Sequence, residues 1–205
     1  MITILDYGLG NVLAFQNVFK RLGIPVAVAK TPAELAGARK LILPGVGAFD
    51  HAMALFERSG LRNAAEELVR ERDVPVVGIC VGMQMLANGS DEGQSRGLGW
   101  IPGRVRRFDV SRLNQSTRLP HMGWNDVRPV QASALLKGLE NDARFYFLHS
   151  YYFEPDSQQS VVAVSEYGCE FACVVRAGHV YGVQFHPEKS HHFGSQLLRN
   201  FAESV

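Results

Sequence analysis

A cysteine flanked by glycines, at residues 78–82 (GICVG), has the clearest potential for chemistry in this sequence. It closes an apolar run, and a helical pattern follows at once. A nucleophile on such a strand-to-helix turn stands clear of the sheet, and the glycines permit the tight backbone. The start of a helix also favours a thiolate at Cys80, because unpaired N–H groups stabilise negative charge. The alternative is a structural cysteine buried behind a core strand.

An imidazole and a carboxylate stand together near the other end of the chain, at residues 184–188 (QFHPE). In an extended segment, side chains two apart share one face, which predicts that His186 and Glu188 lie side by side. A carboxylate beside an imidazole fixes its tautomer and stabilises the imidazolium. With Cys80 these residues would form an activated nucleophile for acyl transfer. A structural histidine is the alternative, and only folding can bring His186 to Cys80.

A third segment, residues 44–47 (PGVG), follows an apolar strand pattern. Active sites of open α/β sheets collect at the carboxyl ends of strands. Here the backbone around Val46 and Gly47, together with the N–H of Val81, can form an oxyanion hole, in which one donor is typically worth about 10²–10³ in rate. The alternative is a structural turn.

Other candidate sites are weaker. Residues 8–10 (GLG) follow a strand pattern, but Leu13 occupies the last position of the dinucleotide fingerprint, where glycine or alanine is expected. His186, Glu188, His191 and His192 do not meet a zinc-ligand spacing, so we predict no metal. Cys169 and Cys173 are expected to pack in a strand.

The elements that must position these residues form two different halves. In the first, short apolar strands alternate with amphipathic helices, which indicates a parallel sheet covered on both faces. The expected strands are 2–6, 26–29, 40–43 and 74–79, and the expected helices begin after Asn11 and cover about 50–58 and 61–72.

The second half predicts strand after strand over 104–130 and 145–185, with candidates at 145–152, 160–165, 171–176 and 180–185. A final helix is expected at about 193–203. No linker or repeat interrupts the chain. We therefore expect a single domain over residues 1–205, of α/β class: an open, mostly parallel sheet with helices on both faces and an antiparallel extension in the C-terminal half.

Composition excludes several classes of protein. The chain has 205 residues with 21 Lys+Arg against 20 Asp+Glu, so it offers no basic excess for sequence-independent nucleic-acid binding. No apolar run approaches the roughly 20 residues that span a bilayer. The first residues lack the basic region of a signal peptide. Three cysteines are an odd and small number, which favours reduced thiols in the cytoplasm.

Taken together, the motifs resemble the class I glutamine amidotransferases, and within them the glutaminase subunits of imidazole glycerol phosphate synthases. The resemblance covers the whole chain in order. It rests on the segments DYGLGN (6–11), PGVGAF (44–49), GICVGMQ (78–84), PHMGWN (120–125), FLHSYY (147–152) and HPEKS (186–190).

The resemblance implies that L-glutamine is hydrolysed to glutamate and ammonia through a γ-glutamyl thioester on Cys80. His186 would protonate the departing ammonia and then activate water, and Glu188 would orient His186. Val46, Gly47 and Val81 would stabilise the oxyanion. Gln84, one helical turn beyond Cys80, and Gly45 are expected at the substrate.

The resemblance further implies a heterodimer with a separate cyclase, a (β/α)₈ barrel that receives the ammonia in histidine biosynthesis. It implies no cofactor. Asn11, Trp124, Tyr146 and Lys189 are expected at the partner interface. Between Gly45 and Gly47, a peptide flip is expected to complete the oxyanion hole.

Several alternatives remain open at this point. The chain can serve another amidotransferase, in pyridoxal phosphate, anthranilate or purine synthesis. It can also be a non-enzymatic scaffold subunit or a stand-alone cysteine hydrolase. A metal-binding regulator is the remaining alternative.

Overall fold

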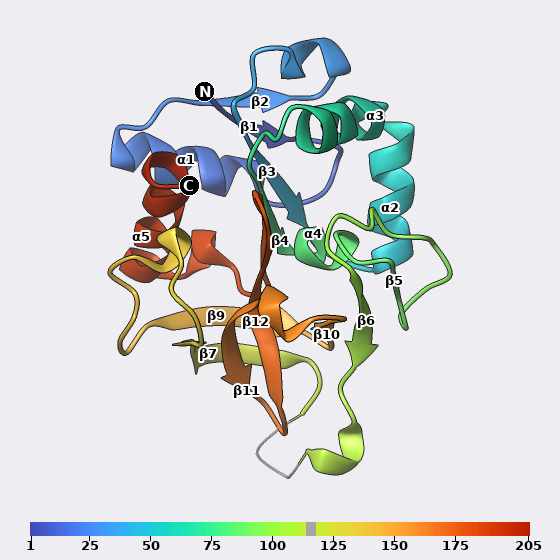
Figure 1. Cartoon of the computed structure of the whole chain (residues 1–205), viewed down its shortest axis with the longest axis vertical. Helices are drawn as coiled ribbons and strands as arrows, with labels where there is room; N and C mark the ends of the chain where they lie inside the picture. Colours follow the sequence, from blue (N-terminus) through green and yellow to red (C-terminus); the bar gives the residue numbers. More distant parts are fainter. Residues whose placement is uncertain (114–117) are drawn as a thin grey trace.

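The structure is a computed structural model that describes residues 1–113 and 118–205 (Figure 1). The parallel part of the main sheet has the order β2-β1-β3-β4-β13, with four strands from the first half of the chain and β13 from near its end. These strands are β1 (Ile2–Leu5), β2 (Val26–Ala29), β3 (Lys40–Gly45), β4 (Val76–Cys80) and β13 (Val180–Val183). Every residue of β1, β4 and β13 is buried, and nearly all of them are apolar, as parallel strands covered on both faces require.

Helices cover both faces of this parallel part. α1 (Val12–Leu22) and α5 (His191–Glu203) lie on one face, and α2 (Phe49–Arg58) and α3 (Leu61–Glu66) lie on the other (Figure 1). The side chain of Asn11 caps α1 by accepting from the N–H of Ala14 at 3.2 Å, and left-handed Gly23 ends the helix. None of the described helices has the length and apolar character needed to cross a membrane.

The second half extends the sheet in antiparallel fashion. β12 (Glu170–Ala177) pairs with β13, and β10 (Tyr151–Pro155) and β6 (Gly103–Arg107) follow in order. The short strand β5 (Gly89–Ser90) ends this order and pairs with β6 in parallel. β11 (Val161–Glu166) pairs with β12 and with β8 (Arg128–Pro129). A separate antiparallel ribbon consists of β7 (His121–Asp126) and β9 (Arg144–His149).

The two faces of the β7–β9 ribbon differ in character. Trp124 lies opposite Tyr146, and Met122 lies opposite Leu148. Met122, Trp124 and Leu148 are exposed large apolar side chains, whereas the alternate residues, His121, Phe145, Phe147 and His149, are buried. The ribbon therefore presents apolar side chains on its outer face and histidines to the interior.

The expected fold class is confirmed, and three local expectations differ from the structure. The run 145–152 is two strands, β9 and β10, which belong to different sheets and are separated by a bend at Ser150. The helix expected over 61–72 is α3 followed by a π-helical segment, Glu67–Glu71. The last strand of the sheet ends at Val183, two residues before its expected end. Residues 114–117, inside the expected strand region 104–130, lie outside the described residues.

Candidate active site

Cys80 occupies a sharp turn between β4 and α4 (Val81–Met85). Its φ of 55° and ψ of −113° are costly for a residue with a side chain, on the order of 1–3 kcal/mol. Close packing holds the turn in place. A Cβ on Gly82 would lie 1.9 Å from the carbonyl oxygen of Leu43, and a Cβ on Gly78 would lie 2.5 Å from that of Gly82. The flanking glycines are therefore required sterically, as the GICVG pattern predicts.

The main chain of His186 is bonded to Tyr146 of β9, directly and through the hydroxyl of Ser190. Its N–H donates to the carbonyl of Tyr146 at 2.8 Å. The hydroxyl of Ser190 donates to the His186 carbonyl at 2.6 Å and accepts from the N–H of Tyr146 at 3.0 Å. These bonds fix the main chain of His186 relative to β9.

Glu188 orients this imidazole. Its Oε1 lies 2.9 Å from Nδ1 of His186, and the two side chains are only 2% and 4% exposed. The pair does not arise as the sequence suggests, because the chain here is not an extended strand. A 3₁₀ turn, Pro187–Lys189, starts directly after His186 and brings the carboxylate back to the ring. The two residues are neighbours, as expected, for a different geometric reason.

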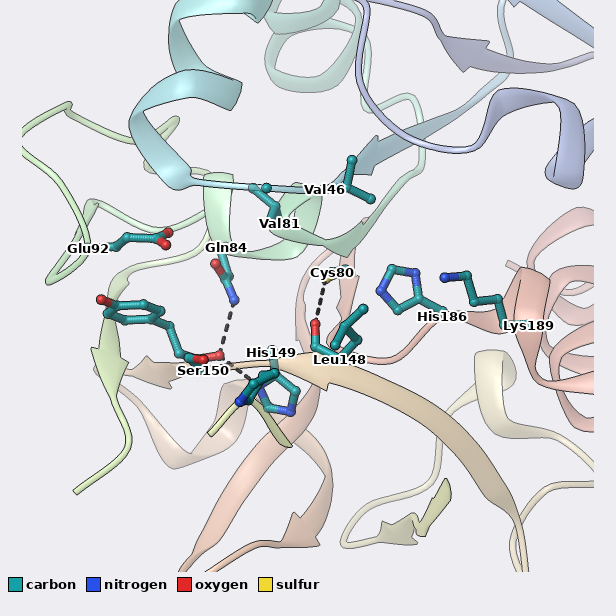
Figure 2. Close-up of a pocket in the computed structure, with 13 residues that line it drawn as sticks. Val46, Cys80, Val81, Gln84, Glu92, Leu148, His149, Ser150, His186 and Lys189 are labelled. Carbon is teal, nitrogen blue, oxygen red and sulfur yellow. Dashed lines mark hydrogen bonds between the residues drawn. The ribbon is translucent and has the colours of Figure 1, made fainter. Parts of the chain in front are cut away.

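The thiol of Cys80 and the imidazole of His186 face the same cavity of about 290 Å³ (Figure 2). Burial lowers the pKa of His186, but hydrogen bonds and charge interactions with Cys80 and Glu188 outweigh it and raise the pKa to about 10. The protonated imidazole is thus favoured beside the sulfur, where it stabilises a thiolate. Folding brings together Cys80, from the middle of the chain, and the His186–Glu188 pair, from near its C-terminal end.

The candidate oxyanion residues surround the same sulfur. Val46, Gly47 and Val81 line the cavity. Val81 is the first residue of α4, so its N–H has no acceptor within the helix. Gly47 has a φ of 85° and open space where a Cβ would stand, so its need for glycine is conformational.

Gly45, expected at the substrate, has a packing role instead. It pairs with Cys80 in the β3–β4 register, and a Cβ on it would lie 2.3 Å from the N atom of Gly82. Gly45 packs against the turn that carries Cys80, whereas the next two residues, Val46 and Gly47, line the cavity.

Gln84 lines the cavity as expected, and its carboxamide is engaged with the protein. Nε2 donates to the carbonyl of Tyr151 and to Oε1 of Gln184, each at 3.1 Å. Sequence reasoning did not single out several other lining residues: Glu92, Pro120, Leu148, His149 and Ser150. All but Glu92 lie in the PHMGWN and FLHSYY segments, but no local spacing shows that these segments reach the cavity.

The residues expected at a partner interface fall into two groups. Trp124, Tyr146 and Lys189 form one cluster, in which Lys189 lies over the Tyr146 ring at 5.7 Å and Trp124 meets that ring edge-on at 6.5 Å. His191, which the sequence left without a role, stacks on Trp124 with an interplanar angle of 2°. Asn11 caps α1 at an exposed position.

A second histidine pair lies at the cavity wall, with His149 lining the cavity and His121 behind it. Nδ1 of His121 is 2.9 Å from Nε2 of His149, and both side chains are buried. Burial lowers the pKa of His121 to about 4, and burial and the neighbouring His121 lower that of His149 to about 3. Both rings are therefore neutral at pH 7.

Known proteins resemble this chain along its whole length. Residues 3–205 match the family model of the class I glutamine amidotransferases. An imidazole glycerol phosphate synthase subunit HisH from Bdellovibrio bacteriovorus is 63% identical over 99% of this chain and 100% of its own. The subunit HisH from Leptospira borgpetersenii is 50% identical over 98% and 99%.

Solved structures agree on the fold. A glutamine amidotransferase crystal structure matches with a TM-score of 0.74 at 24% identity, over 98% of this chain and 97% of its own. A chain in the structure of PurLQS from Thermotoga maritima matches with a TM-score of 0.74 at 18% identity, over 98% and 96%.

Proposed function

The chain belongs to the class I glutamine amidotransferase family, and from that premise we propose that it hydrolyses glutamine with a Cys80–His186–Glu188 triad. Within the family its relatives are imidazole glycerol phosphate synthase subunits HisH, which makes it the glutaminase subunit of such a synthase. The observation that carries the triad is the placement of Cys80 beside the buried His186–Glu188 pair in one cavity.

The reaction follows from this arrangement. The Cys80 thiolate attacks the side-chain carbonyl carbon of glutamine, and the N–H groups around Val46, Gly47 and Val81 receive the oxyanion. Collapse of the tetrahedral intermediate breaks the C–N bond, forms the γ-glutamyl thioester and releases ammonia with a proton from His186. His186 then removes a proton from water, which attacks the thioester and frees glutamate and Cys80. Glu188 keeps the ring in the required tautomer throughout.

The ammonia passes to a cyclase subunit, which uses it to make imidazole glycerol phosphate and an aminoimidazole carboxamide ribonucleotide. In water at neutral pH ammonia is mostly ammonium, which is not a nucleophile, so a shielded route between the subunits is needed. The cluster of Trp124, Tyr146 and Lys189 fits a docking face for this partner, and Asn11 is assigned to the same interface. The reaction needs no cofactor. The three free thiols fit the cytoplasm.

The decisive experiment mixes the purified chain with a cyclase subunit and measures glutamate release with and without the cyclase's nucleotide substrate. We expect low release from the chain alone and strong stimulation in the complex. Substantial activity that ignores both partner and nucleotide would identify a stand-alone hydrolase instead. Stimulation only by the synthase of another pathway would assign the chain to that pathway.

Cys80→Ser tests the nucleophile in the same complex. We expect it to abolish glutamine-dependent product formation, because serine is not activated at this site. The ammonia-dependent reaction of the partner should continue unchanged, which shows that the complex still assembles. Glutamine-dependent turnover close to that of the native chain would contradict the role of Cys80.

Gly47→Ala and Gly47→Pro test whether a peptide flip completes the oxyanion hole. The left-handed φ of Gly47 is unfavourable for alanine and inaccessible to proline. Both variants should therefore reduce the stimulation by nucleotide, and proline should reduce it more. Unchanged stimulation in both variants would count against the flip.

A further inference from the structure

Gln184 contacts the nucleophile, although the triad leaves it without a role. The side chain is fully buried just after β13, and its Nε2 lies 3.7 Å from Sγ of Cys80. Its Oε1 lies 3.1 Å from Nε2 of Gln84. A carboxamide can present either its oxygen or its NH₂ group to the sulfur, so its effect on the thiol depends on its orientation.

The orientation can be derived from one backbone carbonyl, that of Tyr151. A carbonyl oxygen can only accept, and this one is 2.8 Å from Nδ1 of His149 and 3.1 Å from Nε2 of Gln84. His149 must therefore carry its proton on Nδ1, and Gln84 must direct its NH₂ group toward Tyr151. The tautomer of His149 and the amide orientation of Gln84 therefore both follow from the Tyr151 carbonyl.

From His149, the assignment of donors and acceptors extends to His121 and Asn125 of β7. Nε2 of neutral His149 is an acceptor, so His121 donates to it from Nδ1 at 2.9 Å. Nε2 of His121 then accepts from the amide of Asn125 at 3.2 Å. The same Asn125 amide donates to the carbonyl of Glu166 at 2.7 Å, an independent acceptor that requires the same orientation. Every donor along this branch meets an acceptor.

From Gln84, the same assignment extends through Gln184 to Cys80. Since the NH₂ group of Gln84 faces Gln184, the atom that receives it must be the Gln184 oxygen. The NH₂ group of Gln184 is thereby directed at the sulfur. We propose that the Gln184 amide stabilises the Cys80 thiolate by donating an N–H to it, an inference that rests on the proposed role of Cys80 as nucleophile.

This donor offsets an opposing contact. In the thiol form, Sγ of Cys80 donates to the carbonyl of Leu148 at 3.9 Å, which favours the protonated sulfur. The Gln184 N–H favours the ionised sulfur, because hydrogen bonds to charged acceptors are about twice as strong as neutral ones. Gln184 and His186 thus act on the thiolate from separate positions. A change of Gln184 alters none of the titratable residues around the thiol, which are Tyr7, Glu92, His149, His186, Glu188 and Lys189.

The test measures the thiolate directly, as the rate of alkylation of Cys80 by iodoacetamide against pH. The full-length chain carries Cys169→Ser, which removes the partly exposed thiol, and the modified residue is identified by mass spectrometry. In Gln184→Met, which keeps the length of the side chain and loses the donor, we expect the midpoint of the profile to rise by about one pH unit. Below both midpoints, alkylation is then about tenfold slower.

Two further variants complete the test. Gln184→Glu keeps the shape of the side chain, and its ionised form faces the sulfur with an oxygen, so its midpoint should rise at least as far as that of Gln184→Met. This variant carries the test if the methionine variant does not fold. Gln196→Met, a matched change in α5 away from the cavity, should leave the profile unchanged. Midpoints at the native value in both Gln184 variants would overturn the inference.

The experiment also separates this inference from the proposed function. Alkylation needs neither glutamine nor partner, so the profile reports on Gln184 whatever reaction Cys80 serves. If Cys80→Ser abolishes glutamine-dependent turnover and the Gln184 profiles are native, only the inference fails. If Cys80→Ser is active, the triad fails irrespective of the profiles.

Discussion

The structure contains two buried histidine groups whose protons behave in opposite ways. His186, beside Glu188 and Cys80, has a pKa raised to about 10. His149, in the wall of the same cavity, and His121, which contacts it from behind, have pKa values lowered to about 3 and about 4. Burial disfavours the charged ring in all three cases. Burial alone therefore does not decide which histidine can act as an acid or base.

The difference lies in the atoms that face the ring nitrogens. His186 has a carboxylate oxygen on Nδ1 and the nucleophilic thiol nearby, and both favour a positive charge. The His121–His149 pair has the backbone carbonyl of Tyr151 at one end and the side-chain N–H of Asn125 at the other. The amide can be accommodated only by a neutral ring. The first group is arranged for proton transfer and the second for holding the cavity wall.

The largest expected effects come from removing the parts of the catalytic group. In a serine-protease triad, loss of the base costs about 10⁶ in kcat and loss of the orienting carboxylate about 10⁴. We expect the same ranking here, with His186→Ala more damaging than Glu188→Ala, because Glu188 orients the base and carries no proton. Glutamate release in the cyclase complex measures both. Equal losses of activity in the two variants would show that Glu188 does more than orient His186.

A smaller effect, of a few kcal/mol, is expected in the pH dependence of stability. His121 and His149 have folded pKa values below the unfolded value near 6.5, so the unfolded state binds more protons and stability falls as the pH drops from about 6.5 toward 4. Each ring contributes a slope of up to about 1.4 kcal/mol per pH unit. The double variant His121→Gln/His149→Gln should lose this slope between pH 6.5 and 5.

His186 gives the opposite sign. Its folded pKa is raised to about 10, so its stabilising contribution is complete below about pH 6.5 and is lost as the pH rises toward 10. His186→Ala should therefore flatten the alkaline side of the curve and leave the acid side unchanged. Urea unfolding at several pH values measures both curves. A loss of slope on the same side in the two variants would refute the contrast.

The smallest expected effect is a change in the pKa of individual rings on exchanging their partners. Asn125→Asp places a carboxylate beside His121, as Glu188 does beside His186. A nearby opposite charge typically moves a pKa by about 1–3 units. We expect the pKa of His121 to rise, and that of His186 to fall in Glu188→Gln. NMR titration of the ring protons follows both. A pKa of His121 that stays near 4 in Asn125→Asp would show that burial dominates.

Local sequence patterns predicted the nucleophile side of the site well. The strand 26–29, the cap of α1 at Asn11 and the cysteine turn at residue 80 depend on neighbours in the chain, and such signals are visible in the sequence. The fold class, predicted from the alternation of strands and helices, and the family, predicted from the motifs, are both confirmed.

The opposite wall was harder to predict, because its contacts join distant segments. The bonds of Gln184 to Gln84 and of His121 to His149 depend on tertiary structure. The run 145–152 looks like one strand, yet its two parts pair with different sheets, a choice that local hydrophobicity does not encode.

The backbone at Cys80 has an implication for the history of the chain. At its positive φ, glycine is the residue that the conformation favours, and glycine cannot attack a carbonyl. Cys80→Gly should therefore yield an inert protein that resists denaturation better than its parent. Natural selection on folding alone would erase the thiol, and only selection for turnover retains it.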